Sequence, residues 1–375
     1  NKRMKSVGKK LCWKYLIAIA IAAVPLQPMA QSNEKIVNVF NWADYIGSDT
    51  VKNFEKEYGI KVNYDEYESS EMVEAKLLSG RTGYDVVVHS SMYSKRLFPL
   101  NIFQKLDKTK LTNWKLLDPK LMAILATFDP GNNFMAPYSW GSTGIAYNVD
   151  MILERMPDAP LDSGAMLFDP EVVSKFEDCG VSILDSPTDV IPIALVYLGY
   201  ADNTRNPEEI QAAEDLLLSV RPYIRKFTST TFLNDLPNGD LCVSMSWAGD
   251  YATASARAEE VGSDINLAYF VPKEGSLLWV DTIIIPDDAP HTENAYLFLD
   301  YLYRPEVMAD FVNLTHYASP IPAANAFIDE KILNDPAIYP TPEIMERLFL
   351  TEVDPPKYQR QKTRVFTRAK SGLTY

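Results

Sequence analysis

The chain has 375 residues, of which 47% are hydrophobic, and it carries 36 Lys and Arg against 50 Asp and Glu. This length fits two domains with a core large enough to fold without disulfides, which excludes a collagen, a coiled coil or a disordered chain. The net charge of −14 excludes a protein whose main task is to grip nucleic-acid phosphates, and the three histidines almost exclude a multi-histidine metal site.

The first thirty residues have the pattern of an export signal. They hold six Lys and Arg and no acid, and an apolar run over residues 15–26 follows the basic stretch. Such a run matches a secretory signal peptide and is shorter than the roughly 20 residues that span a bilayer. We expect residues 1–30 to be a signal peptide cleaved near Ala30; an uncleaved membrane anchor is the alternative. Removing them leaves 30 basic and 50 acidic residues, a charge of −20 that favours cationic partners.

From residue 36 onward, strand-like and helix-like segments alternate. The pattern predicts strands over 36–40, 61–67 and 86–88, and helices over 48–58 and 71–79, with Ser70 as a cap and Gly59 and Gly80 as stops. This order predicts an α/β fold with a parallel sheet covered on both faces. Further strands are expected at 144–147, 181–184, 242–246, 266–270 and 279–286, and helices at 207–220, 251–260, 293–302, 305–313 and 342–349.

An aromatic residue followed two or three places later by an aspartate occurs three times. The instances are Trp42 with Asp44 and Tyr45, Trp247 with Asp250, and Trp279 with Asp281. The first two follow apolar strands, and ligands of open α/β sheets bind at the loops after the carboxyl ends of strands. Together they predict a cleft for an organic cation, although sugars use the same groups. The alternative is structural, with Trp packed in the core and Asp44 or Asp250 as helix caps.

Signatures of catalysis are missing from the sequence. It contains no G-x-S-x-G elbow, no H-E-x-x-H and no phosphate-binding glycine loop. His89 and Ser90 are neighbours on an extended segment, so their side chains point to opposite faces and are badly placed to share a proton. Paired carboxylates keep a hydrolase open as an alternative. We expect no enzyme, no cofactor and no metal site.

The chain without its first thirty residues keeps two cysteines, Cys179 and Cys242. In an oxidising compartment such a pair most often forms one disulfide, and two buried free thiols are the alternative. A basic segment over residues 357–370 is expected to be a solvated helix face, with a docking role as the alternative.

Many short segments together resemble one known family, the periplasmic polyamine-binding proteins of bacterial ABC importers, close to the putrescine- and spermidine-binding members. The resemblance covers residues 35–372, and its carriers are NWADYI at 41–46, YGIKV at 58–62, GYDVVV at 83–88, CGVS at 179–182, RPYIR at 221–225, WAGD at 247–250, IYP at 338–340, TR at 363–364 and KSG at 370–372. It implies a two-domain periplasmic binding protein fold, type II-like, in which α/β domains close over a ligand at a hinge. The expected domains are 31–139 with 262–322, and 140–261 with 323–375.

The resemblance also implies a function. The protein is expected to capture putrescine or spermidine in the periplasm for uptake by an ABC transporter, with the permease subunits at the inner membrane as partners. We expect a monomer that binds no nucleic acid. A binding protein for another amine or a carbohydrate is the alternative.

Position by position, the resemblance implies a set of site residues. Trp42, Tyr45, Trp247, Trp279 and Tyr317 correspond to aromatic walls, Asp44, Asp250 and Asp281 to ammonium-binding acids, and Ser90 to a polar contact. Cys179 and Cys242 match the family disulfide.

Four positions depart from the family pattern. Asp189 stands where close relatives have Glu, so its carboxylate reaches less far. The indole of Trp279 resembles the spermidine-preferring members, which inclines the expectation slightly toward spermidine. His89 replaces a proline and adds a titratable group near the cleft, or else a rim histidine in water. Gly164 replaces a tryptophan and is expected to loosen the packing there.

Overall fold

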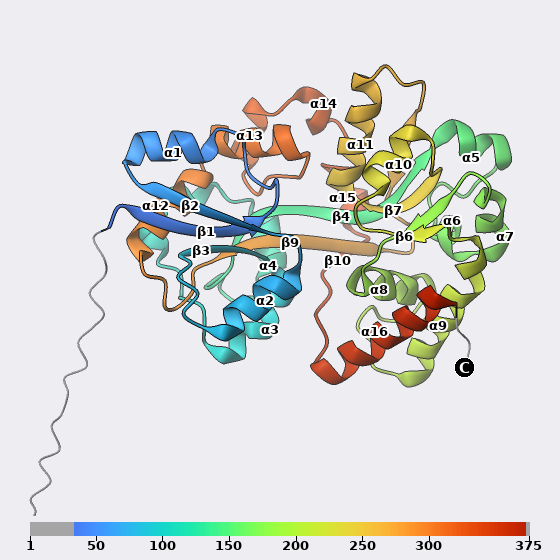
Figure 1. Ribbon diagram of the computed structural model, residues 1–375, viewed down its shortest axis with the longest axis horizontal. Coiled ribbons are helices and arrows are strands. Elements are labelled where there is room, and N and C mark those ends of the chain that lie inside the picture. Colours follow the sequence, from blue (N-terminus) through green and yellow to red (C-terminus); the bar gives the residue numbers. More distant parts are fainter. Residues whose placement is uncertain (1–33, 373–375) are drawn as a thin grey trace, which may run out of the picture.

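The computed structural model describes residues 34–372, so the expected signal peptide and its cleavage near Ala30 lie outside the described residues. Two lobes lie side by side, and two long strands, β4 (Ala136–Asn148) and β9 (Ser276–Ile284), run from one lobe to the other (Figure 1). These two strands are antiparallel neighbours, with Gly141 opposite Trp279. The junction between the lobes is therefore built from strand pairing.

The described strands form one connected sheet of mixed direction, in the order β2-β1-β3-β9-β4-β7-β5-β6, with β8 paired to β4 and β10 to β9. In the first lobe β1 pairs in parallel with β2 and β3, and in the second β5 pairs in parallel with β6 and β7. Their bounds are β1 Ile36–Trp42, β2 Lys61–Tyr67, β3 Val86–Ser90, β5 Val181–Ile183, β6 Lys226–Phe227, β7 Val243–Trp247, β8 Leu267–Phe270 and β10 Leu348–Phe349.

Helices cover both lobes. Those around the first lobe are α1 Thr50–Tyr58, α2 Ser70–Ser79, α3 Ser91–Leu97, α4 Pro119–Leu125, α12 Thr292–Leu302 and α13 Pro305–Thr315. The others are α5 Val149–Arg155, α6 Ala165–Phe168, α7 Pro170–Val173, α8 Pro187–Tyr197, α9 Pro207–Val220, α10 Phe232–Asn238, α11 Ala248–Glu260, α14 Glu330–Leu333, α15 Pro342–Met345 and α16 Pro356–Ser371. Among residues 34–372, none of these helices has the length and apolar character needed to cross a membrane.

The early elements confirm the expected order, because local signals fix their ends. Gly59 ends α1 in the left-handed conformation at φ 63°, and its N–H donates to the carbonyl of Glu55. The helix over 71–79 is also present, but its cap is Ser69, whose side chain accepts from the N–H of Met72; the expectation for Ser70 was wrong by one residue.

Three later segments differ from expectation. β4 begins at Ala136 rather than near residue 144, and the register shift after Pro137 explains how a proline fits inside a buried strand. α8 was not expected, because Pro192 lies inside it. The helix expected over 342–349 stops at Met345, and β10 then pairs with β9. The expected domain boundaries stay a prediction.

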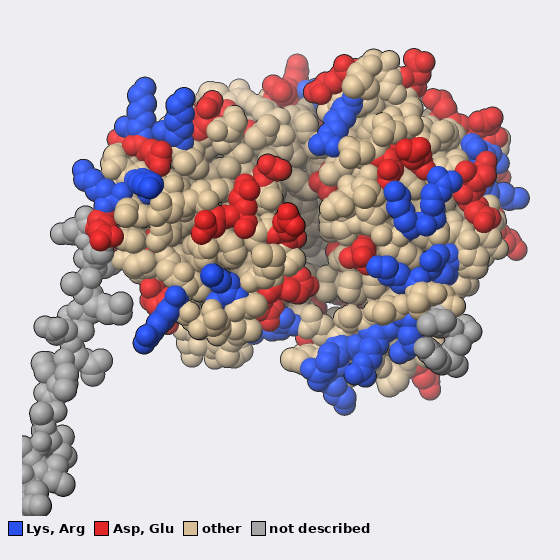
Figure 2. Space-filling view, viewed as in Figure 1, with Lys and Arg blue, Asp and Glu red and all other residues tan. Residues whose placement is uncertain are grey.

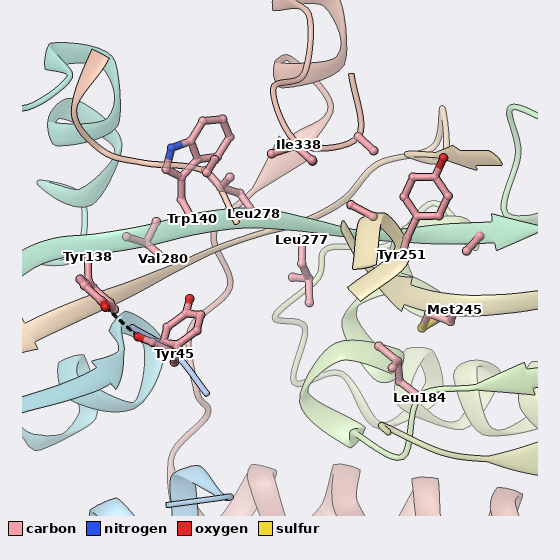
Figure 3. Close-up of a cluster of buried hydrophobic side chains, with 14 of the residues drawn as sticks. Tyr45, Tyr138, Trp140, Leu184, Met245, Tyr251, Leu277, Leu278, Val280 and Ile338 are labelled. Atoms are coloured by element: carbon pink, nitrogen blue, oxygen red, sulfur yellow. Dashed lines mark hydrogen bonds between the residues drawn. The ribbon is translucent and has the colours of Figure 1, made fainter. Parts of the chain in front are cut away.

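The hydrophobic core continues from one lobe to the other along β4 and β9. Figure 3 shows Trp140, Leu278 and Val280 on one side of these strands, with Leu277 and Tyr45 on the other. Side chains alternate along a strand, so Trp279 and Asp281 share the side of Leu277 and Tyr45. The strands that join the lobes thus also present polar and aromatic groups toward the space between them.

Candidate functional site

The candidate site lies between the lobes, where Figure 2 shows the surface hollowed, with acidic side chains along its margin. Side chains arrive from β9, from the loop after β1, from the first turn of α11 and from the loop after α13. Most are partly exposed, and Tyr45 is buried. Solvent therefore reaches a surface built largely of rings and carboxylates.

Asp281 is held at the centre of the sheet. β9 runs between β3 and β4, so Asp281 lies opposite Ser90 on one side and Ser139 on the other. The hydroxyl of Tyr45 donates to its Oδ2 at 2.9 Å. Burial raises the pKa of the Asp281 carboxyl to about 6, and the Tyr45 hydroxyl opposes that rise only in part. No Lys or Arg among the described residues forms an ion pair with it.

Asp250 has a matching environment in the second lobe. It lies in the first turn of α11, and the hydroxyl of Tyr317 donates to its Oδ1 at 2.6 Å. Burial raises the pKa of Asp250 to about 6 as well, against the opposing effects of the Tyr317 hydroxyl and the charge of Arg257.

Neither Asp250 nor Asp44 caps a helix. The N-cap of α11 is Trp247, which makes no side-chain cap bond, and the N-cap of α1 is Asp49. The structural alternative for both aspartates is therefore wrong.

Aromatic rings connect the two carboxylates. Tyr317 meets Tyr45 edge to face with ring centroids 5.6 Å apart, and it meets Trp279 in the same way at 5.3 Å. The hydroxyls of Tyr45 and Tyr317 end on Asp281 and Asp250, respectively. We call the rings of Tyr45, Trp279 and Tyr317 the aromatic slot. Asp281 lies at the Tyr45 hydroxyl of this slot, and Asp250 lies at its Tyr317 hydroxyl.

Asp189 and Trp247 form a second polar group in the second lobe. The indole N–H of Trp247 donates to Asp189 Oδ1 at 3.1 Å, the Thr143 hydroxyl donates to the same oxygen at 2.9 Å, and the Ser186 hydroxyl donates to Oδ2 at 2.6 Å. Burial raises the pKa of Asp189, and these three hydrogen bonds oppose the rise. This carboxylate accepts three protein hydrogen bonds, so it orients the Trp247 ring.

Two of the expected site residues lie outside the contacts of the aromatic slot, and a third lies beside Asp281. Asp44 is exposed at φ 53°, and its carboxylate makes no hydrogen bond or ion pair with residues 34–372. Trp42 packs on Tyr67 at 4.5 Å between ring centroids, and its indole N–H is buried without a partner. Ser90 ends β3 and faces Asp281 across the ladder.

Sequence reasoning missed several residues of the site. Ser139, Gly141 and Thr143 lie on the half of β4 that was not expected to be a strand, and Ser186 precedes the unexpected helix α8. The signal that could have found them is the pairing of β4 with β9. Its register places Ser139 beside Asp281 and Gly141 beside Trp279.

His89 is not a rim histidine in water. It is fully buried in β3, its Nδ1 lies 3.2 Å from the Ser94 hydroxyl, and its Nε2 has no partner. Burial lowers the pKa of His89 to about 3, so it adds no charge to the site at neutral pH.

A protein-family model described as bacterial extracellular solute-binding protein matches residues 49–341. This chain belongs to that family.

The relatives of this solute-binding protein include two periplasmic proteins of similar length. It is 44% identical to the putrescine-binding periplasmic protein SpuD of Pseudomonas aeruginosa over 98% of this chain and 100% of that protein. It is 43% identical to the putrescine-binding periplasmic protein PotF of Escherichia coli over 95% of this chain and 97% of that protein. Among solved structures, the spermidine/putrescine ABC transporter substrate-binding protein PotD of Streptococcus pneumoniae is 25% identical, with a TM-score of 0.77 over 90% of this chain and 99% of that one.

The similarities and the structure confirm three expectations. The fold is the two-domain periplasmic binding protein fold. The family binds solutes for transport, so the expectation of no enzyme is confirmed. The disulfide between Cys179 and Cys242 is present, with 5.5 Å between the two Cα atoms, so the alternative of free thiols is wrong.

Proposed function

We propose that this solute-binding protein captures putrescine in the periplasm and delivers it, as a monomer, to the permease subunits of an ABC importer. One observation carries the proposal: Asp250 and Asp281 are mostly buried carboxylates at the aromatic slot, and neither has a Lys or Arg ion-pair partner among the described residues. A buried charge left without a partner costs several kcal/mol, so a site of this kind favours a ligand that supplies positive charge.

The rings between the acids favour an organic dication over a metal ion. Methylene groups pack against aromatic faces, and an ammonium over a ring gains roughly 0.5 to 2 kcal/mol. Each ammonium would donate charge-assisted hydrogen bonds to Asp250 or Asp281. Within residues 34–372 there is no group of three or more His, Cys, Asp or Glu side chains arranged to hold a metal ion.

Two considerations favour putrescine over spermidine. Relatives named for putrescine are 44% and 43% identical to this chain, whereas a spermidine/putrescine-binding periplasmic protein of Escherichia coli is 32% identical. In addition, the two acids in contact with the aromatic slot accept one hydrogen bond each, while Asp189 accepts three, so the slot itself offers two carboxylates for two ammonium groups. The slight inclination toward spermidine that was based on Trp279 is therefore not maintained.

Calorimetry of refolded, ligand-free protein tests this proposal. We expect the tightest binding with putrescine, weaker binding with cadaverine, spermidine and spermine, and no heat with maltose. Putrescine has six non-hydrogen atoms, so a ceiling of about 1.5 kcal/mol per atom limits its dissociation constant to about 0.3 μM or weaker. Binding of maltose alone would overturn the proposal.

A further inference from the structure

Two glycines lie directly behind the aromatic slot. Gly141 is the register partner of Trp279 across β4 and β9, and Gly249 is the second residue of α11, one place before Asp250. Both are buried. Neither has the positive φ that makes glycine necessary for the backbone, so the reason for glycine has to be sought in what surrounds it.

The surroundings of Gly141 leave no room for a side chain. A Cβ on Gly141 would lie 2.4 Å from Cζ2 and 2.9 Å from Cη2 of the Trp279 indole. Non-bonded carbon atoms are comfortable at about 3.5 to 4.0 Å, so the indole would have to move by roughly 1 Å. Both atoms belong to the benzene half of the indole, which a phenylalanine lacks.

Gly249 stands in the same relation to Tyr317. A Cβ there would lie 2.5 Å from Cε1 and 2.6 Å from Cζ of the Tyr317 ring. That ring donates the hydrogen bond to Asp250 at 2.6 Å. Alanine is the better helix former, so helix propensity does not explain the glycine at this position.

We propose that Gly141 and Gly249 are positioning residues that determine which amines fit the aromatic slot. Their missing side chains let Trp279 and Tyr317 lie flush against β4 and α11, which keeps the space in front of the rings open for a methylene chain. The ligand in this inference rests on the proposed function, whereas the ring contacts do not. A single methyl group behind either ring moves that ring away from the glycine, toward the partly exposed side where the ligand would lie.

The test compares G141A, W279F and the double variant G141A/W279F by calorimetry with putrescine. We expect G141A to bind at least about tenfold more weakly than the wild type, because the displaced indole occupies ligand space. The double variant should bind within about threefold of W279F, because Phe lacks the clashing atoms. Wild-type affinity in G141A, or no recovery in the double variant, would overturn the proposal.

Gly164 supplies the matched control. It is also buried and also has negative φ, and its Cβ would meet an aromatic ring, that of Tyr197, at 3.1 Å, in contact with neither Trp279 nor Tyr317. G164A is expected to leave putrescine affinity unchanged. Thermal unfolding of the ligand-free variants reports the loss of stability in each, so that binding is compared at a temperature where every variant is folded.

G249A adds an independent readout. Moving the Tyr317 ring removes its hydrogen bond to Asp250, so that carboxylate holds its proton more tightly. The pH at which putrescine affinity is half lost should therefore shift upward in G249A and stay in place in G164A. An unshifted pH profile in G249A would show that Tyr317 does not depend on Gly249.

Spectroscopy of the ligand-free protein separates this inference from the proposed function. If wild-type protein binds no putrescine, the proposed function fails. The ring contact is still tested, because displacement of the indole should change the Trp279 contribution to tryptophan fluorescence, measured as the wild type minus W279F. The Trp279 contribution in the G141A background, measured as G141A minus G141A/W279F, should differ from the contribution in the wild-type background. Identical difference spectra would overturn the positioning role.

Discussion

At the scale of single residues, the ionised forms of Asp250 and Asp281 have two opposite effects. Each lowers the stability of the ligand-free protein, and each favours binding of a cationic ligand. Burial raises the pKa of each carboxyl from its ordinary value to about 6, so the folded state holds the proton more tightly than the unfolded chain does. The favourable contribution to stability is complete below the unfolded pKa and is lost as pH rises through about 6. At neutral pH these acids therefore destabilise the ligand-free protein.

Replacing Asp250 by Asn should separate the two effects. At pH 8 we expect ligand-free Asp250→Asn to unfold at a higher temperature than the wild type, because a buried charge has been removed. Putrescine affinity should fall by about 1.5 to 3 kcal/mol, the value of a hydrogen bond to a charged group. Thermal unfolding and calorimetry measure the two effects, and Asp150→Asn, in the exposed first turn of α5, serves as the control. Unchanged affinity in Asp250→Asn would remove this acid from the site.

The same pKa values predict how binding depends on pH. An ammonium favours the ionised carboxylate, so ligand binding lowers the pKa of Asp250 and Asp281 and expels protons near pH 6. Putrescine affinity should be constant above pH 7.5 and fall below pH 6, by about tenfold per pH unit for each acid that must ionise. Calorimetry at pH 6 in buffers of different ionisation enthalpy should detect proton release. Affinity that is flat from pH 8 to pH 5 would contradict this assignment.

At the scale of elements, the sequence predicts best where a local signal marks an end. Gly59 and Gly80 end α1 and α2 as expected. Both residues have positive φ, 63° and 66°, and a backbone in that conformation ends a helix whatever surrounds it. β4 and α8 were underestimated because Pro137 and Pro192 argue against a strand and a helix locally. Tertiary packing overrides such local preferences, and a single sequence does not reveal that packing.

The disulfide allows an element-scale prediction. Cys179 and Cys242 link the segment before β5 to the residue before β7 across a sequence separation of 63. Closing a loop of that length stabilises the fold by about 4 kcal/mol on the chain-entropy model. The double variant Cys179→Ser, Cys242→Ser should therefore lose up to that amount of unfolding free energy while its putrescine affinity stays close to the wild type. A large loss of affinity at a temperature where the variant is fully folded would show that the bridge also holds the site.

At the scale of the whole molecule, the candidate site required information that composition and local pattern do not contain. The three aromatic–aspartate pairs indicated the chemistry, yet the structure joins only Asp250 and Asp281 through rings, with Asp44 exposed and Asp189 occupied by Trp247. Tyr317 is 67 residues from Asp250 in the sequence, and only the fold brings the two side chains together. The net charge of −14 was consistent with a cationic ligand but could not say which of the 50 acids lacked a partner.

A ligand that neutralises acids in both lobes should stabilise the whole molecule. Anything that binds only the folded state stabilises it by mass action, by about 2.7 kcal/mol at a free concentration one hundred times the dissociation constant. Putrescine at that excess should raise the unfolding temperature of the wild type, and the rise should be larger at pH 8 than at pH 5, where Asp250 and Asp281 are mostly protonated. The double variant Asp250→Asn, Asp281→Asn should start from a higher unfolding temperature at pH 8 and gain almost nothing from putrescine. An equal gain in the double variant would mean that the polyamine stabilises the protein through its other surface acids, and a neutral sugar at the same concentration controls for solvent effects.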